Sequence, residues 1–178
     1  MSLLLEPRPV KLLMSLIYGH GAHLDECRKS LSEGLGKIDY TSRDILFDYT
    51  KYYEEEMGTG LRRVIITFRD LIKREEIAEV KIFTNRLEKV FSYQNKRTIN
   101  IDPGYIAQEH LVLTTGKGYA HRPYLGKGVY ADLTLIYTKD EFRTLEWTYP
   151  DYGSAEMREL FMKLRNEYMS QLREVSKQ

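Results

Sequence analysis

The stretch VKLLMSLIYGHGAHLDECRKSLSEGLG, residues 10–36, decides the fold class because two different periodicities follow one another within it. Its first part is dense in apolar residues and ends at Gly19, which is the pattern of a buried strand. The apolar residues of its second part recur at spacings of three and four: Leu24, Cys27, Leu31 and Leu35. That spacing predicts one apolar face of a helix, closed by glycines. A strand followed by a helix therefore opens the fold.

The same two periodicities continue along the chain. LRRVIITFRDL, residues 61–71, alternates apolar and polar residues and predicts a strand, whereas residues 74–91 repeat apolar positions at helical spacing. Extended structure is expected for residues 38–50, and a last helix follows Ser154, a candidate N-cap. Four more strands are predicted at residues 97–106, 109–116, 129–138 and 141–147. We expect Pro103-Gly104 to stop the first of these four strands.

The order strand–helix–strand–strand–helix–strand is that of the split βαβ, or ferredoxin-like, arrangement. We therefore predict an α+β sandwich in which helices pack on one face of a mainly antiparallel sheet, with a hairpin extension and a C-terminal helix. A parallel α/β fold is excluded because only two helices separate six or seven strands. The whole chain, 1–178, is expected to form a single domain with a flexible leader at 1–9.

Composition limits the classes of partner. With 27 basic and 26 acidic residues the net charge is +1, so nucleic acid is a possible partner that the global charge does not favour. The chain holds no apolar run of the ~18 residues that a membrane span needs, so we expect no membrane partner and a cytoplasmic location. The single cysteine, Cys27, excludes an intramolecular disulfide and is expected to be a buried, inert thiol. The sequence leaves the oligomeric state open.

The segment TTGKGYAHRPYLGKGVYADL, residues 114–133, is the strongest candidate for anion binding. Lys117, Arg122 and Lys127 bring three positive charges close together between glycines, whose backbone N–H groups can approach a phosphate. His121 is a titratable neighbour and a candidate catalytic residue, and Tyr130 is a candidate ligand contact. The alternative is an ordinary hairpin with a basic tip. None of the three Gly-Lys pairs has the upstream glycine and following hydroxyl of a P-loop.

Carboxylates supply the other candidate residues. Asp102, before Pro103-Gly104, and Asp132, within a strand, are candidate catalytic groups, and neighbouring Tyr105 is a candidate ligand contact. Asp102 could equally cap its own turn, and Asp132, if buried, needs a partner such as Arg122 or Lys117. Glu54 and Glu55 are candidate ligands of a divalent metal, the one cofactor that the sequence suggests, although a run of glutamates is also typical of a solvated loop.

Four motifs in this order, FDYTKYYEEEMG, NIDPGYI, HRPYLGKGVYADLTL and WTYPDY, resemble the prokaryotic family known as domain of unknown function 4416. The similarity extends from about Pro9 to Leu172. Two positions depart from the family pattern: Pro123 stands where an aliphatic residue is expected, and Asp132 where a glutamate is expected. The resemblance implies a stand-alone cytoplasmic protein without an assigned reaction. Some family members carry a GTP-binding label, for which this chain offers no P-loop.

The leading functional hypothesis is a pocket at the sheet edge that binds a small phosphorylated or nucleotide-like ligand, with hydrolysis or transfer as the reaction class if the protein is an enzyme. The rival hypothesis is a non-enzymatic RNA- or protein-binding module that uses the basic aromatic hairpin; fourteen tyrosines offer stacking surface for it. A third reading is a structural subunit without a site.

Overall fold

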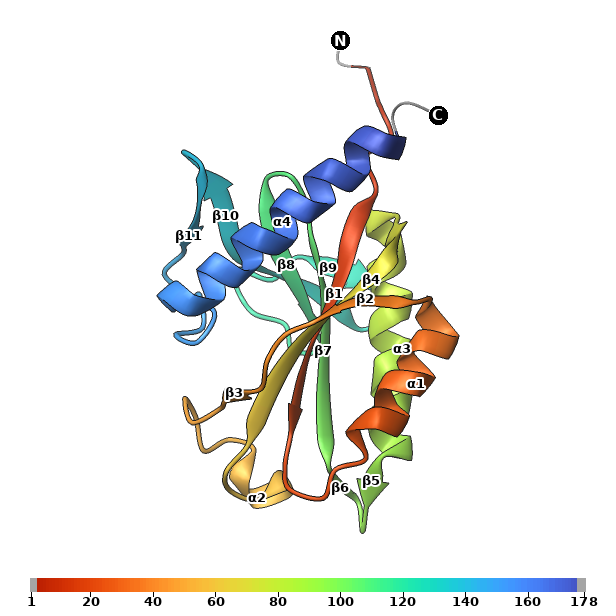
Figure 1. Cartoon of the computed structure of the whole chain (residues 1–178), viewed down its shortest axis with the longest axis vertical. Coiled ribbons are helices and arrows are strands. Elements are labelled where there is room, and N and C mark those ends of the chain that lie inside the picture. Colours follow the sequence, from red (N-terminus) through yellow and green to blue (C-terminus); the bar gives the residue numbers. More distant parts are fainter. Residues whose placement is uncertain (1–2, 176–178) are drawn as a thin grey trace.

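Eleven strands and four helices make up the part of the chain that the computed structural model describes, residues 3–175 (Figure 1). The helices are α1 (Leu24–Leu35), α2 (Glu54–Met57), α3 (Ile77–Val90), which a 3-10 turn (Arg74–Glu76) precedes, and α4 (Ala155–Val175). The first strands are β1 (Val10–Tyr18), β2 (Ile38–Thr41), β3 (Ile45–Leu46), β4 (Arg62–Ile72), β5 (Ser92–Tyr93) and β6 (Lys96–Arg97). The remaining strands are β7 (Ile99–Ile106), β8 (His110–Thr115), β9 (Tyr124–Gly126), β10 (Val129–Thr138) and β11 (Glu141–Thr144).

Nine of these strands form one sheet in the order β11-β10-β8-β7-β1-β4-β2, with β3 added beside β4 and β9 beside β10. Within the described residues, neighbouring strands of this sheet pair antiparallel, and β5 and β6 form a separate small hairpin. The mixed α+β content, the mainly antiparallel sheet and the C-terminal helix are therefore confirmed. Of the predicted leader, residues 1–2 lie outside the described part of the chain.

The central strand β1 is buried on both faces of the sheet. Its residues Leu12, Met14 and Leu16 pack into a core with α1 and α3, whereas Leu13 packs into a second core with α4. Figure 1 shows α4 crossing one face of the sheet while α1 and α3 lie together on the other. Helices thus cover both faces, whereas the sequence placed them on one. The near-continuous apolar run of β1 is the pattern of such a doubly covered strand.

Cys27 illustrates the packing of α1. It is fully buried in the core beneath α1 and α3, and burial raises the pKa of its thiol to about 12. At neutral pH the side chain is therefore a protonated, unreactive thiol, as the sequence predicts. None of the described helices is both long and apolar enough to cross a membrane.

Pro103 and Gly104 do not stop their strand, and on this point the sequence-based expectation is wrong. Strand β7 continues through both residues to Ile106, so Asp102 lies inside a strand and does not cap a turn. Gly104 fits because a Cβ atom there would lie 2.3 Å from the carbonyl oxygen of Val112 on β8. The glycine thus permits a close approach of two backbones, and Pro103 occupies the point where pairing with β8 ends.

A candidate ligand site where the sheet splits

Strands β7 and β8 pair over only part of their length and then diverge. The candidate site lies in the gap between them, which is called the split below. Only residues 104–106 of β7 pair with residues 111–113 of β8, although β7 begins at Ile99 and β8 ends at Thr115. Beyond the ladder, Thr114 Oγ1 donates to the carbonyl oxygen of Pro103 over 2.8 Å. The edge of β7 that faces the split therefore needs side-chain partners for its backbone groups.

Helix α3, which packs on the face of the sheet opposite α4 (Figure 1), supplies those side-chain partners. Lys81 Nζ donates to the carbonyl oxygen of Ile101 over 3.1 Å, and the N–H of Ile101 donates to Glu88 Oε1 over 2.6 Å. Both residues are more than 90% buried. Burial raises the pKa of Glu88, and this effect exceeds the opposing influence of Lys81 and Arg97. A buried acid with a raised pKa in a cleft is a candidate for proton transfer.

The split opens into a cavity of about 620 Å³, a size suited to a small-molecule ligand. Seven separate parts of the chain contribute to its walls. The charged residues that line it are of both signs in equal number. The cations are Arg63, Lys81, Arg97 and Lys117, and the anions are Glu88, Asp102, Asp132 and Asp151.

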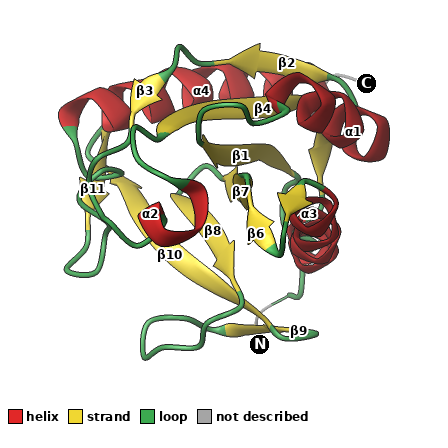
Figure 2. Ribbon diagram, turned by 90° about the horizontal axis from the view of Figure 1, so that it is seen from below, coloured by secondary structure: helices red, strands yellow, loops and turns green. Residues whose placement is uncertain are grey.

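Aromatic side chains line the cavity from its exposed mouth to its buried floor. Six of them line it: Phe47, Tyr49, Tyr52, Tyr53, Tyr149 and Tyr152. Tyr49, Tyr52 and Tyr149 are exposed, whereas Tyr152 is buried at the base of α4. Figure 2, which views the molecule from below, shows α2 in front of the sheet, where its segment brings Tyr52 and Tyr53 to the cavity.

A buried ion pair forms part of the cavity floor. Arg63 Nη1 donates to Asp151 Oδ2, and both residues are only 5% exposed. The Arg63 guanidinium also lies against two rings, 4.6 Å from the centroid of Phe47 and 4.9 Å from that of Tyr152. Contacts of this kind hold a guanidinium in one orientation. This part of the floor therefore carries a charged pair packed against two aromatic rings.

Three of the residues proposed from sequence line this cavity together: Asp102, Asp132 and Lys117. Asp102 accepts hydrogen bonds from Asn100 Nδ2 at 2.7 Å and Lys81 Nζ at 3.4 Å. Lys117 Nζ donates to the Tyr52 hydroxyl over 2.9 Å and lies 4.6 Å from the centre of that ring. No carboxylate partner of Lys117 exists among residues 3–175.

Arg122 and His121 lie behind Asp132 instead of facing the cavity. Arg122 Nε donates to Asp132 Oδ2 over 2.8 Å, which is the partner that a buried carboxylate was expected to need. The other Arg122 nitrogens bind the Lys117 carbonyl oxygen and the Tyr149 hydroxyl. His121 stacks on Trp147 with a centroid distance of 4.8 Å, and its Nε2 lies 3.8 Å from Asp132 Oδ2. These two residues thus position Asp132.

Three other candidates lie outside the cavity. Lys127, at the turn before β10, forms an ion pair with Glu79 of α3. Tyr105 is buried in the core beneath α1 and α3, on the opposite face of the sheet. Tyr130 packs against Tyr124, with ring centroids 5.1 Å apart. In the described structure none of the three lines the cavity.

Glu54 and Glu55 form the first turn of α2, and no group of three potential metal ligands occurs within the described residues. Their neighbour Glu56 is the acid with a defined partner: its carboxylate accepts from Arg97 Nε at 2.9 Å and Nη2 at 2.7 Å. Arg97 lowers the pKa of Glu56 through this hydrogen bonding. The part of the chain that the structure describes gives the proposed metal ligands no third partner, and Glu56 of the acidic segment anchors α2 to β6.

The model of the family described as domain of unknown function, DUF4416, matches residues 8–168 of the 178-residue chain. The chain belongs to this family. The resemblance carried by the four sequence motifs is therefore confirmed, and the whole cavity lies within the matched residues. No curated protein and no solved structure matches the chain.

Sequence reasoning on this DUF4416 chain missed five of the eight charged cavity residues: Arg63, Lys81, Glu88, Arg97 and Asp151. Lys81 and Glu88 lie seven residues apart, adjacent to the apolar stripe of α3, and a charged pair at such positions was the available signal. Arg63 shares a strand face with Ile65, and its burial depends on α4 covering that face. Asp151 gave no comparable signal, because its turn is irregular.

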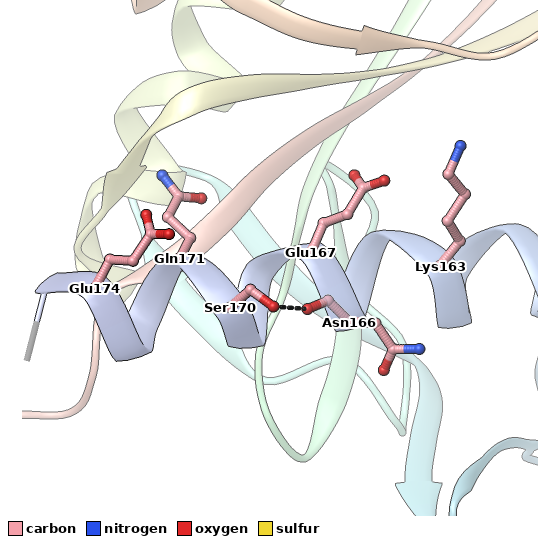
Figure 3. Close-up of a pocket in the computed structure, with 6 residues that line it drawn as sticks. All are labelled: Lys163, Asn166, Glu167, Ser170, Gln171 and Glu174. Carbon is pink, nitrogen blue, oxygen red and sulfur yellow. Dashed lines mark hydrogen bonds between the residues drawn. The ribbon is translucent and has the colours of Figure 1, made fainter.

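A second hollow, of about 710 Å³, runs along α4. Its walls come from one helix: Lys163, Asn166, Glu167, Ser170, Gln171 and Glu174. Figure 3 shows these polar side chains projecting from α4, with the Ser170 hydroxyl donating to the backbone oxygen of Asn166. A site needs groups that converge from several elements. The DUF4416 chain offers that convergence in the split of the sheet, so the candidate site lies there.

Proposed function

We propose that the cavity binds a small phosphorylated or nucleotide-like ligand. The observation that carries this proposal is Lys117, a cavity cation without a carboxylate partner among the described residues, beside the aromatic mouth. Every other cavity cation has an acidic side chain within 4 Å. An incoming anion would thus find one ammonium group whose charge is not already neutralised.

The aromatic mouth favours a ligand that also carries a flat ring. Tyr49, Tyr52 and Tyr149 are exposed around the opening, and Lys117 already lies over the ring of Tyr52. Phenol rings stack on nucleobases and on the apolar faces of sugar rings. A base or sugar ring held by these tyrosines would bring its phosphate to Lys117.

Glu88 supports a catalytic role for the same cavity. Its carboxyl group is buried, lies 3.8 Å from Arg97 Nη1, and has a pKa raised by burial. An acid that retains its proton closer to neutral pH can protonate a leaving group. Hydrolysis or transfer at the phosphate is therefore the reaction class that we propose to test after binding.

A thermal-shift screen tests the binding proposal. Nucleoside monophosphates, sugar phosphates and inorganic phosphate would be compared on the unaltered chain, on Lys117→Met and on Lys127→Met. The second variant is the matched control, because Lys127 is a lysine of the same hairpin that lies outside the cavity. A ligand at a hundred times its dissociation constant adds about 2.7 kcal/mol to the free energy of unfolding.

We expect phosphorylated compounds to stabilise the unaltered chain and Lys127→Met equally, and Lys117→Met far less. Loss of one charge-assisted contact lowers affinity by about 1.5–3 kcal/mol, which is roughly 10- to 150-fold. Equal shifts in both variants, or no shift with any phosphorylated compound, would overturn the proposal.

The second candidate function is a macromolecular contact through the hairpin, and the exposure of Tyr119, Tyr124 and Leu125 favours it. Its electrostatic support is smaller than the sequence suggested, because Arg122 is paired with Asp132 and Lys127 with Glu79. Binding to single-stranded RNA would be measured against salt concentration. An RNA reader loses affinity with a slope of about −0.7 per phosphate contacted in a log–log plot.

Three finer expectations remain proposals: the ferredoxin-like unit, the cytoplasmic location and the single domain. The elements β1, α1, β2, β4, α3 and β7 follow the chain order of a ferredoxin-like unit, with β1 and β4 adjacent and β2 outside β4. We infer that this unit forms the body of the fold, to which β8–β11 and α4 are added. A cytoplasmic location and a single domain over 1–178 likewise stay predictions.

A further inference from the structure

Two buried aspartates of the cavity each use one carboxylate oxygen and leave the other without a partner. Asp132 Oδ2 accepts from Arg122 Nε, and Asp151 Oδ2 accepts from Arg63 Nη1. Among residues 3–175 no hydrogen bond reaches Oδ1 of either side chain. Both residues are at least 95% buried, and both line the cavity. Each of these two lining residues therefore brings a carboxylate oxygen without a partner among the described residues to the wall of the cavity.

An unused carboxylate oxygen in a buried site requires a donor from the ligand or from water. An ionised carboxylate can only accept hydrogen bonds, so the matching ligand groups must be hydroxyls or amines. Leaving such an oxygen unpaired when a ligand displaces water costs binding free energy. The cavity therefore selects for a ligand that donates at two points.

Charge balance favours hydroxyls over amines at these two points. Asp132 is already neutralised by Arg122, and Asp151 by Arg63. A ligand ammonium group would leave a net positive charge beside each of these two ion pairs. In a buried site an uncompensated charge costs desolvation free energy. A hydroxyl supplies the donor without changing the charge.

We propose that the ligand is the phosphate ester of a polyhydroxylated sugar, whose hydroxyls donate to Asp132 Oδ1 and Asp151 Oδ1. This inference rests on the proposed phosphate-binding function, in which Lys117 holds the phosphate. The exposed tyrosines at the mouth then contact the sugar ring or an attached base. A free sugar phosphate and a nucleotide share this chemistry, and the tyrosine contacts would distinguish them.

The first experiment varies the ligand and leaves the protein unaltered. Affinities would be measured by titration calorimetry for ribose 5-phosphate, 2-deoxyribose 5-phosphate, adenosine 5′-monophosphate, its 2′-deoxy form and phosphoethanolamine. We expect each ribose compound to bind at least about tenfold more tightly than its deoxy form, because a hydrogen bond to a charged partner is lost. Tighter binding of the nucleotide than of ribose 5-phosphate would identify a nucleotide, and the reverse a free sugar phosphate.

The second experiment varies the protein. Asp132→Asn is compared with Asp140→Asn, a matched change at a carboxylate in the turn between β10 and β11, outside the cavity. We expect the ribose-to-deoxy ratio to fall by about tenfold in Asp132→Asn and to stay unchanged in Asp140→Asn. Because the ratio is internal to each variant, a general loss of affinity does not imitate the result. If Asp132→Asn does not fold, the ligand series on the unaltered chain decides.

The outcomes separate this inference from the proposed function. Lys117-dependent binding of phosphorylated compounds with equal ribose and deoxy affinities would leave the phosphate site standing and overturn the hydroxyl contacts. Tightest binding of phosphoethanolamine would replace hydroxyls by an ammonium group and would also overturn them. Binding of ribose that gains nothing from a phosphate would support the hydroxyl contacts and contradict the phosphate site.

Discussion

Two effects act in opposite directions on the ionisation of Glu88: its hydrogen bond from Ile101 favours the ionised carboxylate, whereas its burial disfavours that form. Its Oε1 accepts the Ile101 N–H that β8 leaves without a strand partner, so its position is fixed by the split of the sheet. Burial at that position disfavours the ionised carboxylate and raises its pKa above the ordinary value of 4.5, an effect that Asp102 reinforces and that Lys81 and Arg97 oppose. The fold therefore stabilises the protonated form of Glu88 relative to the unfolded chain.

This difference predicts a pH dependence of stability. A group whose pKa is raised on folding contributes stability that is present below the unfolded-state pKa and is lost as pH rises through the folded-state pKa. Glu88→Gln keeps an oxygen for the Ile101 N–H but cannot ionise. We expect the unaltered chain to lose stability relative to Glu88→Gln as pH rises from 4.5 to 8, measured by urea unfolding at each pH. Glu55→Gln, at an exposed acid, is the control; parallel profiles for the chain and Glu88→Gln would contradict the prediction.

Residue types and spacing were sufficient to select Asp102, Asp132 and Lys117, which line one cavity although they lie on three separate segments. Within residues 114–133, closeness in sequence wrongly suggested that all three basic residues face one ligand. Lys127 and Arg122 share a basic stretch with Lys117, but pairing to Glu79 and Asp132 removes them from the cavity. Glu79 lies on the distant helix α3, so no local pattern could have revealed the partner of Lys127, whereas Asp132 lies in the same stretch as Arg122 and the pair was expected from the sequence.

At the scale of elements, α2 and β6 are joined by one side-chain pair. Glu56 of α2 binds the Arg97 side chain in a bidentate manner and also accepts the Arg97 backbone N–H at 3.0 Å. Helix α2 is one turn long and contains no buried residue. A helix of that length has little stability of its own, so this pair fixes the segment that carries Tyr52 and Tyr53.

We predict that Glu56→Gln loosens this segment without unfolding the protein. Loss of the bidentate pair, which is partly exposed, is expected to cost about 1–2 kcal/mol. Amide hydrogen exchange of Met57 and Gly58, whose N–H groups donate within this turn, should accelerate roughly 5- to 30-fold. Glu55→Gln in the same turn is the control and should leave exchange unchanged. Acceleration spread over β1 and β7 as well would show that the pair supports the whole fold instead.

The elements themselves were largely predictable, because each carries a strong period of two or of three to four. The patterns that predict β1 and α1 both lie within residues 10–36, and both elements form there. The continuation of β7 through Pro103 was not predictable from the sequence. A proline has no N–H group, so a strand tolerates it only where the adjacent strand offers no acceptor for a backbone hydrogen bond. That absence is set by the divergence of β7 from β8, which is a tertiary feature.

At the scale of the whole molecule, β1 joins the two cores. Alternate residues of this strand belong to the core beneath α1 and α3 and to the core beneath α4. Because the strand backbone cannot order one face without the other, the free energy of each core supports the other. A strand shared by both cores supports the expectation of a single domain, which stays a prediction.

Leu164→Ala tests that coupling. Leu164 of α4 is fully buried, and its truncation is expected to cost about 2–5 kcal/mol and to lower the melting temperature by about 2–4 °C for each kcal/mol. If the two cores unfold together, the loss of helix measured by far-ultraviolet circular dichroism and the change in Trp147 fluorescence will shift to the same lower urea concentration. Asn166→Ala, at an exposed position of the same helix, should shift both by at most about 0.5 kcal/mol. A circular-dichroism phase that remains at the urea concentration of the unaltered chain would mean that α1 and α3 keep their core after α4 has detached, so that the chain unfolds as two units joined at β1.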